Sequence, residues 1–270
     1  MSKVIVLTGG ASGIGAAALD RFVSGGHDVY VLDVAMAKVS TGKFIECDLA
    51  HRAAIDFAVR RLPSRIDALV NVAGIPGPSP ADTVVAVNFL GLRHLTLSLL
   101  PRIQAGGSVV NVASSAARDW QKNAALVSAM LDTTGFDEGL AWLDVHRDAW
   151  AANPYKFSKQ CVAAWTYRAT GLALPRQVRV NCVNPGSTTT QLTPAFRRIV
   201  GDSLYDWGVA QIGRAGTPAD IAPVIEFLAI GPCPWLNGVE IMVDGGYVAG
   251  IVGGWIDTDS APGLVARPGP

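Results

Sequence analysis

The sequence of 270 residues lacks the long apolar segments and basic clusters of membrane and nucleic-acid-binding proteins. Half of its residues are apolar, but no uninterrupted apolar run approaches the roughly 18 residues of a membrane span. Lysine and arginine together number 22, as do aspartate and glutamate, so no net charge attracts an anionic partner. The first residues, MSKVIVLTGG, carry no signal-peptide cleavage pattern. We therefore expect a soluble, cytoplasmic protein without nucleic-acid or membrane partners.

Cysteine is also scarce. Cys47, Cys161, Cys182 and Cys233 show neither metal-ligand spacing nor the density of a disulfide framework. We expect them to be small buried side chains in a reducing compartment, and we expect no metal site. Internal repeats and long low-complexity linkers are absent too. A single domain is therefore the simpler prediction.

Apolar strand-like runs alternate with helical patterns along the chain. The runs predict strands at residues 3–8, 28–33, 43–47, 67–74, 107–115, 177–183 and 239–243. Helices are predicted at 14–25, 51–62, 81–104 (as one or two helices), 153–172 and 218–229. This alternation is typical of an α/β protein with a doubly wound parallel sheet of the Rossmann type. Such a sheet binds ligands beyond the carboxyl ends of its strands, where the polar motifs of this chain fall.

The segment TGGASGIG (8–15) follows the first predicted strand and opens the first helix. Gly9, Gly13 and Gly15 permit a tight turn in which backbone amides approach a pyrophosphate. A plain connection between strand and helix is the alternative. The position in a βαβ unit favours a dinucleotide.

Two aspartates follow the next strands. Asp33 ends the second strand, where its carboxylate would accept hydrogen bonds from ribose hydroxyls and repel a 2′-phosphate. Because the glycine turn contains no lysine or arginine, we predict NAD rather than NADP. Asp48 follows the third strand and could contact adenine, although a helix cap is a serious alternative.

Nine motifs occur in a family-like order: TGGASGIG, Asp33, CDL (47–49), NVAG (71–74), VNFLG (87–91), VNVASS (110–115), YKFSK (155–159), NPG (184–186) and VDGG (243–246). From residue 3 to about 248 the chain thus resembles the short-chain dehydrogenase/reductase family, and most of all the bacterial 3α-hydroxysteroid dehydrogenase/carbonyl reductases. The resemblance implies NAD contacts at Gly9, Ser12, Gly13, Ile14, Gly15, Asp33, Asp48, Leu49, Asn71, Ala73, Gly74, Tyr155, Lys159, Pro185, Gly186, Thr188 and Thr190.

The resemblance also implies a catalytic set of Asn88, Ser114, Tyr155 and Lys159. Tyr155 would be the acid/base, Ser114 would bind the substrate oxygen, and Asn88 would hold a relaying water. A tyrosine pKa near 10 makes a poor base at neutral pH, so we expect the ammonium group of Lys159, one helical turn away, to lower it. Taken singly, these residues could be an unremarkable helix pair, a turn serine and a core-edge asparagine.

The chain departs from the family pattern by a helical insertion at about 116–152, before Tyr155, which contains Trp120, Trp142 and Trp150. The insertion could wall an apolar pocket, alter subunit contacts, or pack on itself as a surface helix pair. A lid is expected at about 188–214. The predicted substrate contacts are Ser114, Tyr155, Trp120, Trp150 and Phe196.

Residues 1–250 are predicted to form the NAD-binding catalytic domain. Residues 251–270 are predicted to be a tail, either disordered or in contact with another subunit.

The predicted function is interconversion of a secondary alcohol and a ketone on an apolar, cyclic substrate such as a hydroxysteroid, with NAD(H). A 3-oxoacyl-thioester reductase and a non-catalytic NAD-binding sensor are the alternatives. A homodimer or homotetramer is expected, as in many members of the family.

Overall fold

The computed structural model describes residues 1–35, 42–77 and 79–263. Seven parallel strands form one sheet in the order β3-β2-β1-β4-β5-β6-β7. The strands are β1 Val4–Thr8, β2 Asp28–Asp33, β3 Lys43–Glu46, β4 Ile66–Asn71, β5 Ile103–Val112, β6 Arg179–Pro185 and β7 Glu240–Val243. The predicted Rossmann-type α/β fold is confirmed, and each predicted strand is present.

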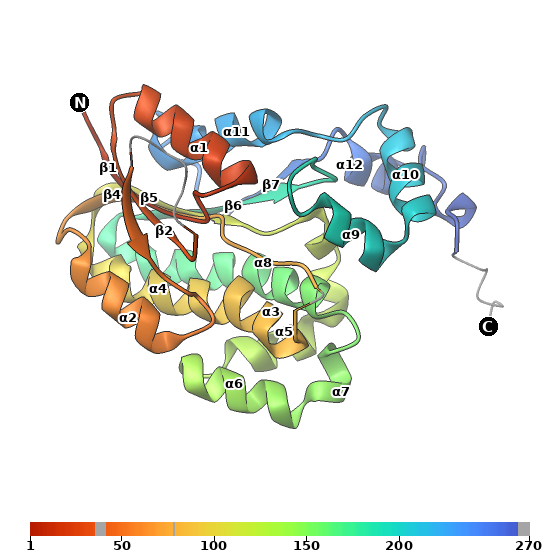
Figure 1. Cartoon of the computed structure of the whole chain (residues 1–270), viewed down its shortest axis with the longest axis horizontal. Helices are drawn as coiled ribbons and strands as arrows, with labels where there is room; N and C mark the ends of the chain where they lie inside the picture. The colour runs from red at the N-terminus through yellow and green to blue at the C-terminus, as the bar shows by residue number, and fades with distance from the viewer. Residues whose placement is uncertain (36–41, 78, 264–270) are drawn as a thin grey trace.

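Helices cover both faces of the sheet (Figure 1). Helices α1 (Gly13–Ser24) and α11 (Pro218–Ile230) lie on one face, while α2 (Arg52–Arg61), α4 (Leu92–Leu99) and α8 (Pro154–Ala173) lie on the other. Two buried apolar clusters, one on each side, fill the space between the sheet and these helices. Because both faces are buried, the strands consist of nearly continuous apolar runs.

Strand β4 ends at Asn71 rather than at residue 74. The hydroxyl of Thr8, at the end of β1, accepts hydrogen bonds from the backbone N–H groups of Val72 and Ala73, each at 3.1 Å. These bonds replace the strand ladder and turn the chain out of the sheet. Strand β5 likewise ends at Val112, ahead of the predicted end at 115.

The predicted helical region 81–104 comprises α3 (Ala81–Val85), a π-helical turn (Ala86–Gly91) and α4. The 22-residue stretch Ala81–Arg102 is long and apolar enough to cross a membrane by composition, with a mean hydropathy of 1.5. However, 67% of its most apolar window is buried inside the protein. Such burial is typical of a core helix.

The insertion contains α5 (Ala124–Leu131), α6 (Phe136–Val145) and α7 (Arg147–Trp150). Helices α6 and α7 form an extra layer outside α3 and α5 (Figure 1). The buried guanidinium group of Arg93 donates hydrogen bonds to the carbonyl oxygens of Thr133 at 3.0 Å and Gly135 at 2.7 Å. Arg93, from α4, therefore fastens the turn between α5 and α6 to the core.

The chain remains ordered beyond the predicted domain end at residue 250. Helix α12 (Tyr247–Gly253) is followed by a segment in which Ile256 and Ala261 are buried. This corrects the expectation of a disordered end for residues up to 263. Residues 264–270 of the predicted tail lie outside the described part.

Candidate active site

A cleft of about 1350 Å³ runs along the carboxyl ends of the strands. Its walls come from the loops after β1, β2, β3, β4 and β5, from the N-terminal part of α8, and from the segments after β6 and β7. Within the described residues, no group of three or more His, Cys, Asp or Glu side chains could hold a metal ion.

The glycine turn forms one end of the cleft. Gly9 has a φ of +74°, and a Cβ added at Gly15 would lie 1.9 Å from the carbonyl oxygen of Gly9. Side chains are thus excluded from both positions. Ser12 precedes α1, and its side chain accepts no hydrogen bond from the first N–H groups of the helix. The side chain of Ser12 therefore leaves these N–H groups available to a ligand. This geometry fits a pyrophosphate.

Asp33 and Asp48 line the same end of the cleft. One carboxylate oxygen of Asp33 accepts a 2.9 Å hydrogen bond from the N–H of Ala11, which fixes the carboxylate beside the glycine turn. Asp48 accepts from the N–H of Ala50 at 2.8 Å and lies 3.7 Å from His51, the residue before α2. His51 also lines the cleft, although none of the sequence motifs includes it.

Tyr155 and Lys159 lie on the first turns of α8. Asn153 caps this helix, because its side chain accepts the N–H of Lys156 at 3.0 Å, and Pro154 is the first helical residue. The ammonium group of Lys159 donates to the carbonyl oxygen of Val112 at 2.9 Å and lies 5.9 Å from the centre of the Tyr155 ring. Helix start and lysine position thus agree with the predictions.

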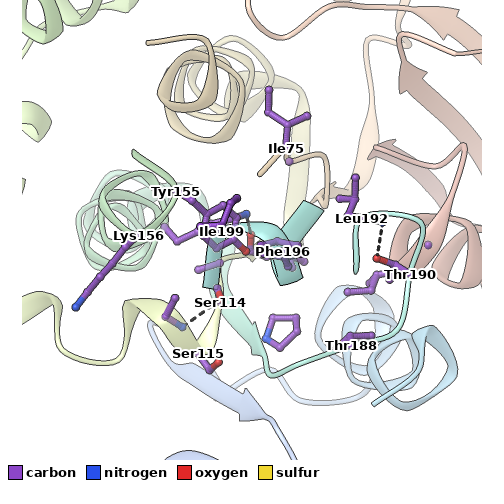
Figure 2. Close-up of a pocket in the computed structure, with 18 of the residues that line it drawn as sticks. Ile75, Ser114, Ser115, Tyr155, Lys156, Thr188, Thr190, Leu192, Phe196 and Ile199 are labelled. Carbon is purple, nitrogen blue, oxygen red and sulfur yellow. Dashed lines mark hydrogen bonds between the residues drawn. The ribbon is translucent and has the colours of Figure 1, made fainter. Parts of the chain in front are cut away.

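Ser114 follows β5 and lies beside Tyr155 in the cleft (Figure 2). Its hydroxyl accepts a hydrogen bond from the N–H of Ala116 at 3.1 Å, which begins a short 3-10 turn. This bond leaves the hydroxyl proton available to a ligand oxygen. Ser114, Tyr155 and Lys159 all line the cleft.

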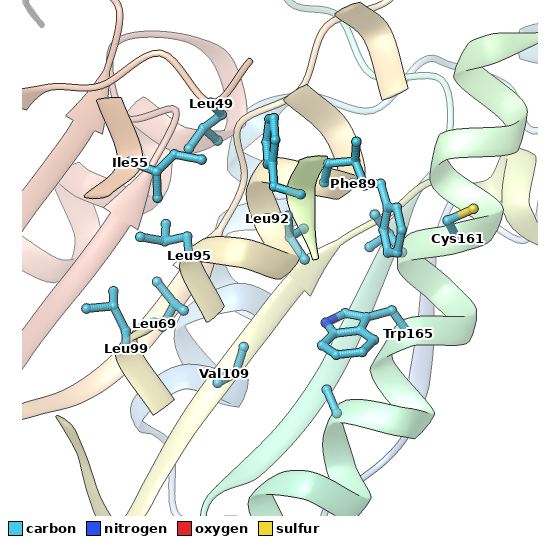
Figure 3. Packing of buried hydrophobic residues seen from close by; sticks show 14 of the residues in the cluster. Leu49, Ile55, Leu69, Phe89, Leu92, Leu95, Leu99, Val109, Cys161 and Trp165 are labelled. Atoms are coloured by element: carbon cyan, nitrogen blue, oxygen red, sulfur yellow. The ribbon is translucent and has the colours of Figure 1, made fainter. Parts of the chain in front are cut away.

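Asn88 lies in the π-helical turn. Phe89 of the same turn and Leu92, which follows the turn, pack into the core (Figure 3). The Asn88 amide donates to the Ile75 carbonyl oxygen at 3.0 Å and accepts the Ile75 N–H at 2.8 Å. It also donates to the hydroxyl of Ser158 at 3.0 Å. Asn88 therefore holds the loop after β4 rather than lining the cleft, and its water-relay role stays a prediction.

The expected acidification of Tyr155 is wrong for this structure. Burial raises the pKa of the Tyr155 phenol to about 12, and the neighbouring Ser114 hydroxyl acts in the opposite direction. Burial likewise lowers the pKa of the Lys159 ammonium group to about 8. Desolvation disfavours both charged forms, and at 5.9 Å the lysine does not overcome this effect.

Helices α9 (Thr193–Val200) and α10 (Asp202–Gln211) cover the part of the cleft next to Tyr155. The Phe196 ring lies edge-on to the Tyr155 ring with centroids 4.9 Å apart (Figure 2). Phe196 thus lines the cleft beside Tyr155, while its contact with substrate and the role of residues 188–214 as a lid stay predictions. Arg197 holds the two helices together by ion pairs with Asp202 and Asp206, each at 2.6 Å.

Most residues predicted to contact the cofactor line the cleft, and their contacts with the cofactor stay predictions. Thr190 lies beside Gly13, since a Cβ added there would be 3.4 Å from its methyl carbon. Thr188 pairs with Gly216 in an isolated bridge. Of the seventeen predicted contacts, the cleft lining includes Gly9, Ser12, Gly13, Ile14, Gly15, Asp33, Asp48, Leu49, Ala73, Gly74, Tyr155, Lys159, Pro185, Gly186, Thr188 and Thr190.

Asn71 is the exception. Its side chain is buried beneath the sheet end, where it donates to Thr96 at 3.1 Å and Asn111 at 2.9 Å. The amide oxygen of Asn71 has no hydrogen-bond partner among the described residues. Asn71 thus lies outside the cleft lining, and its cofactor contact stays a prediction.

The predicted substrate contacts Trp120 and Trp150 are also wrong. The Trp120 indole donates to the Glu240 carboxylate at 3.1 Å, outside the cleft. Trp150 is 3% exposed and donates to the Leu143 carbonyl oxygen at 2.9 Å, packed on Phe157. The apolar wall instead comes from the lid and the C-terminal segment, at Phe196, Ile199, Trp207, Ile251 and Ala261.

The cleft of this Rossmann-type sheet has a glycine turn at one end and a Ser-Tyr-Lys group at the other. This arrangement is typical of a dinucleotide-dependent oxidoreductase. A family model described as short chain dehydrogenase matches residues 3–129, and one described as enoyl-(acyl carrier protein) reductase matches residues 139–248. A coniferyl-alcohol dehydrogenase of Pseudomonas sp. (strain HR199 / DSM 7063) is 35% identical over 249 residues, 92% of this chain and 97% of that protein. The chain belongs to the short-chain dehydrogenase family, whose members are oxidoreductases of alcohols and ketones.

The expected similarity to 3α-hydroxysteroid dehydrogenases is confirmed as well. The 3-alpha-hydroxysteroid dehydrogenase/carbonyl reductase of Comamonas testosteroni is 27% identical over 257 residues, 92% of this chain and 97% of that protein. The crystal structure of the 3-alpha-hydroxysteroid dehydrogenase from Pseudomonas sp. B-0831, complexed with NADH, superposes with a TM-score of 0.78 at 29% identity. The match covers 94% of this chain and all of that one.

Proposed function

We propose that this protein uses NAD(H) to interconvert a hydroxyl and a carbonyl group on an apolar, cyclic substrate. The observation that carries the proposal is the placement of Ser114, Tyr155 and Lys159 in one cleft under an apolar lid. The catalytic set supports proton movement at a substrate oxygen, and the apolar wall supports the choice of substrate.

The glycine turn and Asp33 fit NAD. The turn leaves room for a pyrophosphate that a Cβ at Gly15 would remove. The carboxylate of Asp33 can accept hydrogen bonds from two ribose hydroxyls, and its charge disfavours a 2′-phosphate. Bound NAD supplies the hydride acceptor or, when reduced, the donor.

Tyr155 is the proton donor in the direction of carbonyl reduction. With a pKa of about 12 its phenol is neutral at physiological pH and able to donate to a substrate oxygen. Ser114 donates a second hydrogen bond to the same oxygen. Lys159, with a pKa of about 8, carries most of its positive charge at neutral pH and stabilises negative charge that develops on Tyr155.

The proposed substrate class rests on the apolar side chains opposite Tyr155. Phe196, Ile199 and Trp207 of the lid and Ile251 of α12 present hydrocarbon surface to the cleft. The related 3-alpha-hydroxysteroid dehydrogenases support a cyclic secondary alcohol. A primary aromatic alcohol is a second candidate, because the coniferyl-alcohol dehydrogenase is 35% identical over 97% of its length.

Spectrophotometric assays of NADH consumption with a panel of substrates test the proposal. The panel includes steroid ketones, aromatic aldehydes and 3-oxoacyl thioesters, each with NADH and with NADPH. Turnover of a cyclic ketone or aromatic aldehyde with NADH is the expected result. Turnover of thioesters alone would favour the acyl reductase, and NADH binding without any turnover would favour a sensor. The predicted homodimer or homotetramer stays a prediction.

A further inference from the structure

The rim of the cleft near Tyr155 carries an excess of positive charge. Arg118 and Lys122, at the start of the insertion, both line the cleft, and both side chains are exposed. The N–H of Lys122 donates to the carbonyl oxygen of Asp119 at 3.0 Å, so the two cations are presented by one compact turn. The turn follows Ser114 closely in the chain, which places it at the substrate end.

The carboxylate nearest these cations is already engaged. Asp119 accepts hydrogen bonds from the ammonium group of Lys156 at 3.0 Å and from the Gln160 amide at 3.3 Å. Since Lys156 follows Tyr155 on α8, this ion pair also ties the turn to the catalytic helix. Arg118 makes only a 3.5 Å bond to the Ser115 carbonyl oxygen, and Lys122 has no carboxylate partner within the described residues.

Carboxylates elsewhere around the cleft do not balance this charge. Asp33 and Asp48 lie at the glycine-turn end, and Asp82 lies 4.0 Å from Arg147 of the insertion. On the lid, Asp202 and Asp206 both pair with Arg197. Among the side chains described here, the substrate end therefore combines an apolar wall with two cations that form no ion pair, although Arg118 helps Lys156 to lower the pKa of Asp119.

We propose that Arg118 and Lys122 bind a carboxylate of the substrate, so that the enzyme acts on an apolar alcohol or ketone with an acidic group remote from the reacting oxygen. The inference rests on the proposed function and specifies its substrate class. Guanidinium and ammonium groups both suit a carboxylate, and the planar Arg118 can bind it with two hydrogen bonds. The apolar body of the same molecule would lie against Phe196 and Ile199.

The attraction is modest because both cations are exposed. We expect the carboxylate form of a substrate to bind about three- to tenfold more tightly than its methyl ester. Salt should weaken this preference, since the screening length falls from about 10 Å at about 0.1 M salt to about 3 Å at about 1 M. The ester, which has no charge, should not respond in this way.

Two matched pairs of ketones test the inference: dehydrocholic acid with its methyl ester, and 4-acetylbenzoic acid with its methyl ester. Binding is measured by calorimetry on the enzyme saturated with NAD⁺, in which a ketone cannot be reduced. Turnover with NADH is measured separately. In the Arg118→Gln/Lys122→Gln variant, the preference for the carboxylate should fall to about onefold.

The control is Arg60→Gln/Arg61→Gln, which removes two exposed cations of α2 outside the cleft lining and should keep the preference. Equal binding of acid and ester in both pairs, no binding of either acid, or an unchanged preference in the Arg118/Lys122 variant would overturn the inference. A preference in binding without turnover of any ketone would support the cationic site and count against the proposed reaction, so the two failures are distinguishable.

Discussion

Replacing Lys159 by methionine should abolish activity and yet make the folded protein more stable at neutral pH. The lysine is 4% exposed and, among the described residues, forms no ion pair with a carboxylate; its ammonium group donates to the carbonyl oxygen of Val112 at 2.9 Å. Burial lowers its pKa from the ordinary 10.5 to about 8. At neutral pH the fold therefore contains a buried charge that methionine, of similar length, would remove.

The size of the effect follows from the two pKa values. The gap between 10.5 and about 8 corresponds to about 3 kcal/mol of penalty on the charged form. Methionine leaves the Val112 carbonyl oxygen without its donor, which costs about 1 to 2 kcal/mol. The net expectation is a gain of about 1 to 2 kcal/mol in the free energy of unfolding at neutral pH.

At high pH the difference in free energy of unfolding between Lys159→Met and the unsubstituted protein changes sign. Between about pH 8 and about pH 10.5 the unfolded chain binds the Lys159 proton and the folded chain does not, so stability rises with pH through this group. Its contribution is fully present above about pH 10.5 and is lost as the pH falls to about 8. The advantage of Lys159→Met should therefore shrink by about 3 kcal/mol across this window and change sign within it.

Urea unfolding of both proteins at a series of pH values gives this difference directly. The contributions of tyrosines and cysteines that do not interact with Lys159 cancel in the subtraction, whereas the pKa of Cys182, which Lys159 lowers, rises in the variant. Lys43→Met is a control of the same substitution at an exposed site, because Asp28 raises the pKa of this lysine above the ordinary 10.5 and the group stays charged in both states over the lower part of the window. A variant that is destabilised at neutral pH, with a difference that does not change from about pH 8 to about pH 10.5, would refute the assigned burial penalty.

Three further outcomes follow from the site. Tyr155→Phe should lower kcat by about 10²- to 10⁴-fold while NADH binding, followed by fluorescence, stays intact; normal turnover would exclude Tyr155 as the proton donor. Asp33→Ala should narrow the preference for NADH over NADPH, seen as the ratio of kcat/KM values, and an unchanged ratio would remove Asp33 from ribose recognition. Gly15→Ala should destabilise the fold by about 3 kcal/mol or more and prevent NADH binding, because its Cβ would meet the Gly9 carbonyl oxygen; urea unfolding and NADH titration decide this.

The succession of strands and helices along the chain and the edge of the sheet at which the site lies could be predicted from the sequence. Apolar strands that alternate with helices, recognised by the helical spacing of their apolar residues, permit few topologies. Right-handed crossovers then place the loops that carry the motifs at one edge of the sheet. The glycine turn, Asp33 and the Tyr155–Lys159 pair needed only local spacing and strand ends to be located. The structure brings all of them into the cleft.

The substrate end was less predictable, because its walls depend on contacts distant in sequence. Trp120 reaches Glu240 across the edge of the sheet, and Trp150 packs on Phe157. Aromatic residues in an insertion give no sign of whether they face the cleft or the core. The C-terminal segment carries no recognisable motif, yet Ile251 and Ala261 line the cleft.

Glu240 explains how an insertion with few apolar cleft contacts can still serve the site. Its carboxylate accepts hydrogen bonds from Trp120 of the insertion at 3.1 Å, from Tyr167 of α8 at 2.9 Å and from Asn184 of β6 at 2.7 Å. One edge-strand residue thus links the insertion, the helix that carries Tyr155 and the strand that leads to the loop of Gly186. Since the same insertion begins with Arg118 and Lys122, this anchor fixes the cationic rim relative to Tyr155. The insertion would then contribute charge to the site while the lid and the C-terminal segment contribute its apolar surface.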